Sequence, residues 1–170
     1  VYVNAHEFAH QWFGDLVTSV SPEAHWIHEG FATFFHHYWL GEFFGKDEYY
    51  KQLDIYRSAS FAASKKNIRP ISHSGAGSAR HYFKASIVIE MLRQDLGEDA
   101  FRTTLTEFLK RYAHKTVSSE DFLRTVYDVT GKPMNWFWDQ WVYRGGEPMV
   151  RAELTKKWGK SYLILEQTQP

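Results

Sequence analysis

Five consecutive residues near the start of the chain constrain it more than any other feature: they read His6-Glu7-Phe8-Ala9-His10. On a helix, side chains four positions apart lie on the same face, so both imidazoles can reach one ion. Glu7 lies next to that face and can reach a water molecule at the ion. Two neutral nitrogen ligands and a neighbouring carboxylate suit zinc, with the carboxylate as general base. The alternative is a surface helix that carries two histidines by chance.

A third ligand is needed, because a catalytic zinc usually has three protein ligands and one open position. Glu29 follows His10 with eighteen residues between them. It lies in the apolar stretch Trp26 to Phe31, inside a second expected helix that starts at Ser21-Pro22. If residues 14–21 form a turn, this helix folds back on the first and Glu29 can face both histidines. The alternative for Glu29 is a carboxylate on a helix surface, which rarely has such apolar neighbours.

The rest of the chain predicts a mainly helical fold. After Arg144-Gly145-Gly146 the pattern changes to two strand-like runs with a turn at 156–160, which indicates a hairpin. We expect helical residues at 1–145 and the start of a following β-domain at 146–170. The expected helices are 1–16, about 22 to 40 (ended by Gly41 and Gly45), 46 to about 63, 81–96, 98–112, 118–130 and 134–143, with a loop at 65–80 and strands at 150–155 and 161–167.

Composition excludes several classes of protein. There is no cysteine, so neither a disulfide framework nor a thiolate metal site can form. The 20 basic residues balance the 20 acidic ones, so a nucleic-acid partner is not indicated. No apolar run is long enough to predict a membrane span. The compartment is not indicated.

The motifs together resemble the aminopeptidase N family of zinc metallopeptidases, which are gluzincins with a thermolysin-like catalytic domain. The resemblance starts at His6 and the run that follows it, and continues at Glu29-Gly30-Phe31-Ala32. It extends to His81-Tyr82-Phe83-Lys84, which is similar to the family's Tyr-x-Lys-Gly segment, and to Gly146-Glu147-Pro148, which is similar to its Gly-x-Pro exit into a β-sandwich. The resemblance therefore implies the zinc-bearing helical half of such a domain, followed by a β-hairpin.

The resemblance also implies residue roles. His6, His10 and Glu29 would bind one Zn²⁺ per chain, Glu7 would be the general base, and Tyr82 would donate a hydrogen bond to the tetrahedral oxyanion. A phenol is a suitable donor for that purpose. From the residues alone, however, an ordinary core or surface tyrosine would be preferred for Tyr82. The substrates would be peptides that lose their N-terminal residues.

Some positions depart from the family. His28 stands where Asn is common, and we expect it to pack or to form a hydrogen bond. His36 stands where the family commonly has Glu, and we expect an ordinary polar contact. Ala85 replaces a Gly. The Gly-x-Met-x-Asn segment that lies upstream of the first motif in the family, and helps to hold the peptide and its free amine, is not in this sequence.

Two alternatives remain open. The first is a thermolysin-like zinc endopeptidase. The second is a zinc-binding fragment that is not catalytically competent by itself, which the missing upstream segment favours. Because the sequence opens with Val1 and leads directly into the motif, we expect a piece of a longer protein, whose remaining domains would be its partners.

Overall fold

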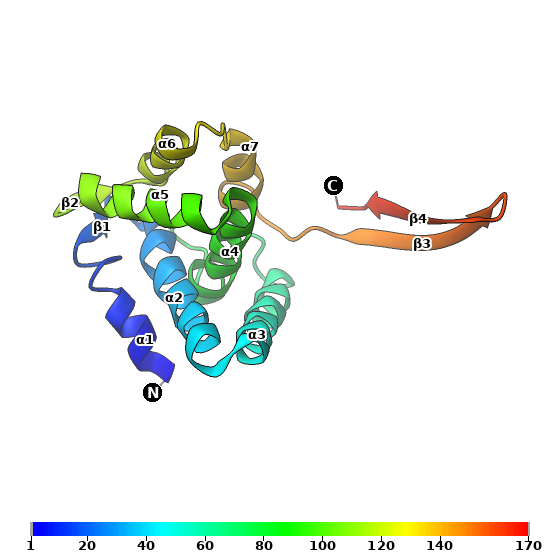
Figure 1. Cartoon of the computed structure of the whole chain (residues 1–170), viewed down its shortest axis with the longest axis horizontal. Coiled ribbons are helices and arrows are strands. Elements are labelled where there is room, and N and C mark those ends of the chain that lie inside the picture. Colours follow the sequence, from blue (N-terminus) through cyan, green and yellow to red (C-terminus); the bar gives the residue numbers. More distant parts are fainter. Residues whose placement is uncertain (1, 170) are drawn as a thin grey trace.

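The computed structural model describes residues 2–169. Helices form one body, and a two-stranded hairpin projects from it on an extended segment (Figure 1). The elements are α1 (Tyr2–Ala9), β1 (Val17–Ser19), a 3₁₀ turn η1 (Pro22–Ala24), α2 (Trp26–Phe44), α3 (Lys46–Ser64), a π-helical turn η2 (Ala79–Lys84), α4 (Ala85–Leu96), α5 (Glu98–Arg111), β2 (Lys115–Val117), α6 (Ser119–Thr130), α7 (Asn135–Phe137), a π-helical turn η3 (Trp138–Val142), β3 (Val150–Lys157) and β4 (Lys160–Gln167).

Helix α2 lies in the centre of the body and packs against α1, α3, α4 and η2. Its sequence is apolar on most sides, as in a helix that is surrounded by neighbours. Phe31, which is fully buried, stacks on Phe13 with 4.2 Å between ring centroids and meets Phe122 edge to face at 5.2 Å. The aromatic core therefore joins α2 to the segment after α1 and to α6.

The first helix is shorter than expected. It ends at Ala9, and the expectation of a helix over 1–16 is wrong from His10 onward. In that segment the backbone bonds first tighten to three-residue steps, which start at the amides of Gln11 and Trp12. They then widen to five-residue steps, from the amide of Asp15 to the carbonyl of His10 and from Leu16 to Gln11. Gly14 adopts a φ of +150°, which a regular helix does not contain. His10 therefore lies in the turn directly after α1.

Helix α2 also differs from its predicted bounds. The expected start at Pro22 is a separate 3₁₀ turn, and the helix continues beyond Leu40 to Phe44. Gly41 does not end the helix. A Cβ at this position would lie 2.9 Å from the Tyr49 ring, so this glycine lets α3 approach α2 closely. The helix ends at Gly45, where φ is +96°. The second glycine, not the first, is the break.

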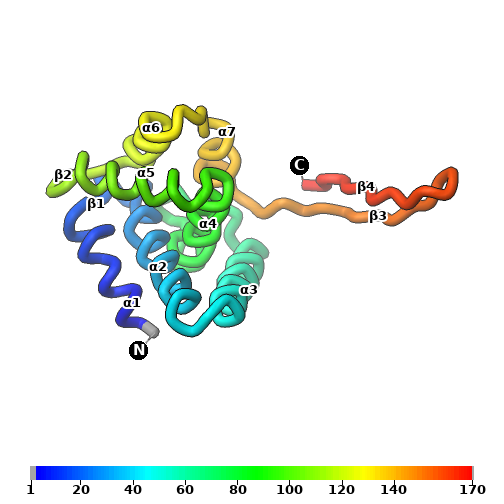
Figure 2. Tube along the Cα trace, viewed as in Figure 1, coloured from blue at the N-terminus to red at the C-terminus, as the bar shows by residue number. Residues whose placement is uncertain are grey.

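A short parallel pair of strands was not predicted. Residues 17–19 pair with residues 115–117, in a register that places Val17 opposite Lys115. The pair connects the segment after α1 to the segment after α5 (Figure 2). Three-residue strands have too few positions to show an alternating pattern, so the sequence carried no usable signal. The pairing holds the turn that follows His10.

The later elements agree closely with the expectations. Ser118 caps α6: its hydroxyl accepts from the amide of Asp121 at 3.2 Å, and the Asp121 carboxylate accepts from the amide of Ser118 at 2.9 Å. Such a capping box stabilises the start of a helix. The loop expected at 65–80 ends slightly earlier, at the π-helical turn that starts at Ala79, and the helix expected at 134–143 consists of α7 and η3.

The predicted hairpin is present. β3 and β4 pair antiparallel along their full length, and all but one of their residues are exposed. Trp158 and Gly159 form the turn, with φ of 49° and 74°. Two positive φ values are typical of the turn type that suits the twist of a hairpin. Among the helices of residues 2–169, none has the length and apolar character needed to cross a membrane.

Gly30 allows a close contact between α2 and α4. A Cβ at this position would lie 2.7 Å from the Cβ of Ala85. We expect Gly30→Ala to lower the free energy of unfolding by about 1–3 kcal/mol, because the two helices would have to move apart. Urea unfolding measures this change. The exposed helical substitution Ser58→Ala should change it by less than about 0.5 kcal/mol. An unchanged midpoint for Gly30→Ala would contradict the close contact.

Candidate metal centre

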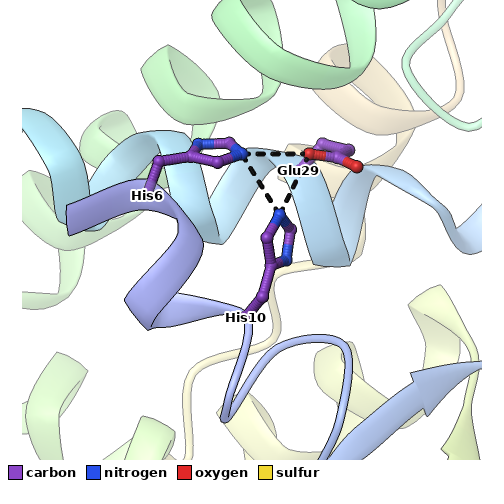
Figure 3. Close-up of side chains that lie close together, drawn as sticks. All are labelled: His6, His10 and Glu29. Atoms are coloured by element: carbon purple, nitrogen blue, oxygen red, sulfur yellow. Dashed lines mark hydrogen bonds and ion pairs between the residues drawn. The ribbon is translucent and has the colours of Figure 1, made fainter. Parts of the chain in front are cut away.

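Three predicted ligands meet between α1 and α2. The Nε2 atoms of His6 and His10 lie 3.1 Å apart, and Oε2 of Glu29 lies 3.3 Å from the first and 3.5 Å from the second (Figure 3). His6 comes from α1, His10 from the turn after it, and Glu29 from the first turn of α2. Among residues 2–169, this is the group whose donor atoms could together hold a metal ion.

Each imidazole is held by its other nitrogen. Nδ1 of His10 donates to the carbonyl oxygen of Phe13 at 2.9 Å, and Nδ1 of His6 lies 3.4 Å from the Thr33 hydroxyl. A proton on Nδ1 of His10 leaves Nε2 as a bare lone pair that points toward Glu29. Ligand histidines are commonly oriented by such a bond at the second nitrogen.

Glu29 supplies a negative charge from a buried position. Its Oε2 atom is buried, and no hydrogen-bond partner is recorded for it among the described residues. Burial raises the pKa of the Glu29 carboxyl, but the neighbouring His6, Tyr82, His10 and His25 side chains outweigh burial and bring the pKa below its usual value. The carboxyl is therefore ionised at neutral pH, which is the form that binds a cation.

The arrangement fits zinc. Four ligands placed tetrahedrally at about 2.0–2.1 Å from a zinc ion are about 3.3 Å from one another. The three observed separations of 3.1, 3.3 and 3.5 Å lie around this value. With both imidazoles protonated on Nδ1, their two Nε2 lone pairs and the carboxylate oxygen would repel one another at such distances unless a cation lay between them. Two imidazoles and one carboxylate also form the donor set of several catalytic zinc sites.

Glu7 and Tyr82 lie beside this group. Glu7 is exposed on α1, next to His6 in the sequence. The Tyr82 ring is stacked on the His6 imidazole, with 5.7 Å between centroids and 5° between planes. Burial raises the pKa of the Tyr82 hydroxyl to about 12, helped by the charge of Glu29, a hydrogen bond to Glu29 and the charge of Glu7. Tyr82 therefore keeps its proton and can donate it in a hydrogen bond at neutral pH.

Comparison with known proteins agrees with this geometry. Residues 1–141 match the sequence profile described as the Peptidase family M1 domain. The chain belongs to peptidase family M1. Its mainly helical fold and its resemblance to the aminopeptidase N family are thereby confirmed, and M1 relatives include zinc metallopeptidases of known structure.

M1 relatives are much longer than this chain. Aminopeptidase M1-C of Oryza sativa subsp. japonica is 34% identical over 159 residues, which are 88% of this chain and 18% of the relative. Glutamyl aminopeptidase of Bitis rhinoceros is 28% identical over 96% of this chain and 18% of its own length. The chain thus spans about a fifth of the curated relatives that it matches.

The fold is also that of M1 enzymes of known structure. The M1 zinc metallopeptidase of Deinococcus radiodurans aligns with a TM-score of 0.74 and 26% identity, over 87% of this chain and 34% of that one. Native yeast LTA4 hydrolase aligns with a TM-score of 0.77 over 87% of this chain and 26% of its own. At 24% identity, this second likeness concerns the fold alone.

The structure adds partners that the sequence analysis did not assign. Nε2 of His25 lies 3.4 Å from the second carboxylate oxygen of Glu29. Its position four residues before Glu29, one helical turn away, was a signal that could have been used. Thr33 had no comparable signal. His28 accepts a hydrogen bond from the amide of Ser19 at 2.6 Å, and Nδ1 of His36 lies 2.8 Å from the Tyr56 hydroxyl. Both contacts agree with the polar roles expected for these histidines.

Proposed function

We propose that the complete protein is a zinc-dependent aminopeptidase and that His6, His10 and Glu29 bind one zinc ion per chain. The observation that carries this proposal is the convergence of two imidazole Nε2 atoms and a buried carboxylate oxygen at tetrahedral spacing. Zinc bound there would act as a Lewis acid toward water and the scissile carbonyl.

Glu7 is the general base in this proposal. It accepts a proton from the attacking water and then delivers it to the amine of the leaving peptide. Its exposed position beside His6 leaves the carboxylate accessible to a substrate. Its charge adds to the effects of burial and Glu29 that raise the pKa of the Tyr82 hydroxyl, so Glu7 acts electrostatically on that tyrosine.

Tyr82 is the oxyanion donor. An amide carbonyl gains negative charge during hydrolysis, and a donor aimed at that charge lowers the barrier. With a pKa of about 12, the hydroxyl remains protonated at any pH at which a peptidase works. The Tyr82 ring stacks on the His6 imidazole, which holds the side chain next to the ligand group.

The substrate class is supported by the relatives. Several of them carry aminopeptidase names, and a variant of the Deinococcus radiodurans enzyme has been solved with a Tyr-Ser-Ala substrate. We propose peptides with a free N-terminus as substrates here. This chain covers only a small part of the length of each relative, such as 18% of Aminopeptidase M1-C. For the isolated 170 residues, this small coverage supports the alternative of a zinc-binding piece without turnover.

We also propose that residues 1–145 are the helical part of the catalytic domain and that 146–170 begin a following β-domain. Two observations support this division. The family match ends at residue 141, and the hairpin after it is exposed on nearly every residue. A lone hairpin is marginally stable in water, so further strands would have to cover it. The remaining domains of the complete protein are then the partners of this chain.

Peptide cleavage by the complete protein tests the function. It should release N-terminal residues from an unblocked peptide and act at least about 100-fold more slowly on the N-acetylated peptide, because the site would lose its contact with the free amine. Internal cleavage of the acetylated peptide at a similar rate would instead identify an endopeptidase. The 170-residue chain is assayed beside it, and we expect it to be far less active.

A further inference from the structure

Tyr82 is flanked in the sequence by two buried cationic residues. Its π-helical turn, η2, also contains Arg80 and Lys84, two positions before and after it. Arg80 is fully buried and Lys84 is 4% exposed. Two positive charges so close together in a buried turn repel each other and need a shared counter-charge.

That counter-charge comes from a distant part of the chain. The Glu147 carboxylate forms ion pairs with Arg80 and, at 3.5 Å, with Lys84. Ser60 and Ser64 of α3 lie 3.1 and 2.8 Å from the same carboxylate oxygen and can donate to it. Glu147 lies between η3 and β3. The segment that joins these two elements leads from the helical body to the hairpin (Figure 1). The carboxylate that pairs with both cations thus comes from outside the helices of the site.

The backbone next to Glu147 is held as well. Lys84 donates to the carbonyl oxygen of Gly146, and the amide of Gly146 donates to the carbonyl oxygen of Ile68 at 2.8 Å. Gly145 packs so closely on Ile68 that a Cβ there would lie 1.7 Å from its carbonyl oxygen. The carboxylate therefore reaches the turn from a fixed segment and does not depend on a flexible tail.

The pKa shifts agree with a coupled group. Burial lowers the pKa of the Lys84 ammonium, and the Glu147 charge opposes that effect. Burial raises the pKa of the Glu147 carboxyl, but Lys84, Ser64 and Arg80 together bring it below its usual value. Both side chains are charged in the pair, so loss of the carboxylate removes the counter-charge that Arg80 and Lys84 share in the turn that carries Tyr82.

We propose that Glu147 is a positioning residue for Tyr82: by joining Arg80 and Lys84, it fixes the π-helical turn that carries the tyrosine. The segment that enters the hairpin is thereby coupled to the reaction centre. This inference rests on the proposed role of Tyr82. It predicts that loss of the Glu147 charge lowers turnover through the tyrosine and in no other way.

A double-mutant cycle in the complete protein tests the coupling. We expect Tyr82→Phe to lower kcat by about 100-fold. Glu147→Gln should lower kcat by about tenfold through misplacement of the hydroxyl, with KM changed by less than about twofold. In the Tyr82→Phe background, Glu147→Gln should have no further effect on kcat. An equal loss in both backgrounds would overturn the inference alone. An unchanged kcat for Tyr82→Phe would refute the role of Tyr82 and the inference with it.

A second readout needs no activity. In the 170-residue chain, Glu147→Gln should speed hydrogen exchange of the amides of residues 79–84 by about tenfold or more, while α5 and α6 keep their protection. Unchanged exchange in η2 would contradict the inference. If Glu147→Gln does not fold, both experiments use Glu147→Asp, which withdraws the charge from Arg80 and Lys84 by one methylene group and should show the same effects at smaller size.

The matched control is Glu166→Gln. Glu166 also pairs with an arginine, Arg151, but this pair is exposed on the hairpin. Loss of an exposed ion pair has little effect. We expect kcat and the exchange of residues 79–84 to be unchanged in this variant. The same loss of turnover as in Glu147→Gln would assign the effect to the hairpin in general and would contradict a specific role for Glu147.

Discussion

Glu7→Gln in the complete protein should lower kcat by about 10²- to 10⁴-fold and leave the zinc content unchanged. Glutamine has the same size and can still form hydrogen bonds, but it cannot accept the proton of the attacking water. Glu7 is not among the three side chains whose donor atoms converge, so the metal should remain. Steady-state kinetics and zinc analysis of the same preparation separate the two effects.

An exposed carboxylate on the hairpin serves as the control for this substitution. Glu153→Gln removes the same charge from β3, and kcat should stay within about twofold of the unmodified protein. If Glu7→Gln retains more than about a tenth of the original kcat, the carboxylate is not the general base. Loss of zinc in Glu7→Gln would instead assign Glu7 to the binding of the metal.

Glu29→Ala should weaken zinc binding by more than about 100-fold. Loss of a residue that only supports a ligand typically lowers metal affinity by about 10- to 100-fold, and loss of a ligand itself should lower it further. The substitution removes the one negative charge among the three converging donors and leaves two neutral imidazoles. Titration of the 170-residue chain with zinc, in competition with a chromogenic chelator, gives the affinity.

His28→Gln is the matched control, since His28 adjoins Glu29 in the sequence but bonds to the amide of Ser19. The zinc affinity of this variant should stay within about threefold of the original. Circular dichroism of both variants checks that the helices remain. Equal affinity for Glu29→Ala and the original chain, with both folded, would remove Glu29 from the ligand set.

The sequence predicted that His6, His10 and Glu29 meet, because the geometry that brings them together is mostly local. Two histidines four residues apart meet on one side of a helix, and a short reversal returns a second helix to the first. The departure lies at His10, which follows the end of α1 in a turn of wider hydrogen bonding. The His10 imidazole still reaches Glu29, because the chain up to His10 remains coiled as in a helix. The first backbone bond that spans five residues runs from the amide of Asp15 to the carbonyl oxygen of His10.

The rest of the arrangement could not be predicted, because it depends on contacts between distant residues. The β1–β2 pair joins segments about a hundred residues apart with three residues each. The ion pair of Arg80 with Glu147 spans 67 positions and follows no periodic pattern. The π-helical form of η2 depends on what surrounds the turn, and the residues of the turn alone predict an ordinary helix.

The zinc content of the purified 170-residue chain tests the central claim most directly, because it does not depend on activity. The chain is saturated with zinc, freed of unbound metal by gel filtration and analysed by mass spectrometry of the metal. The account predicts about one zinc per chain, as expected for a site with three protein ligands. A chain that shows a helical circular dichroism spectrum and retains no zinc would contradict it.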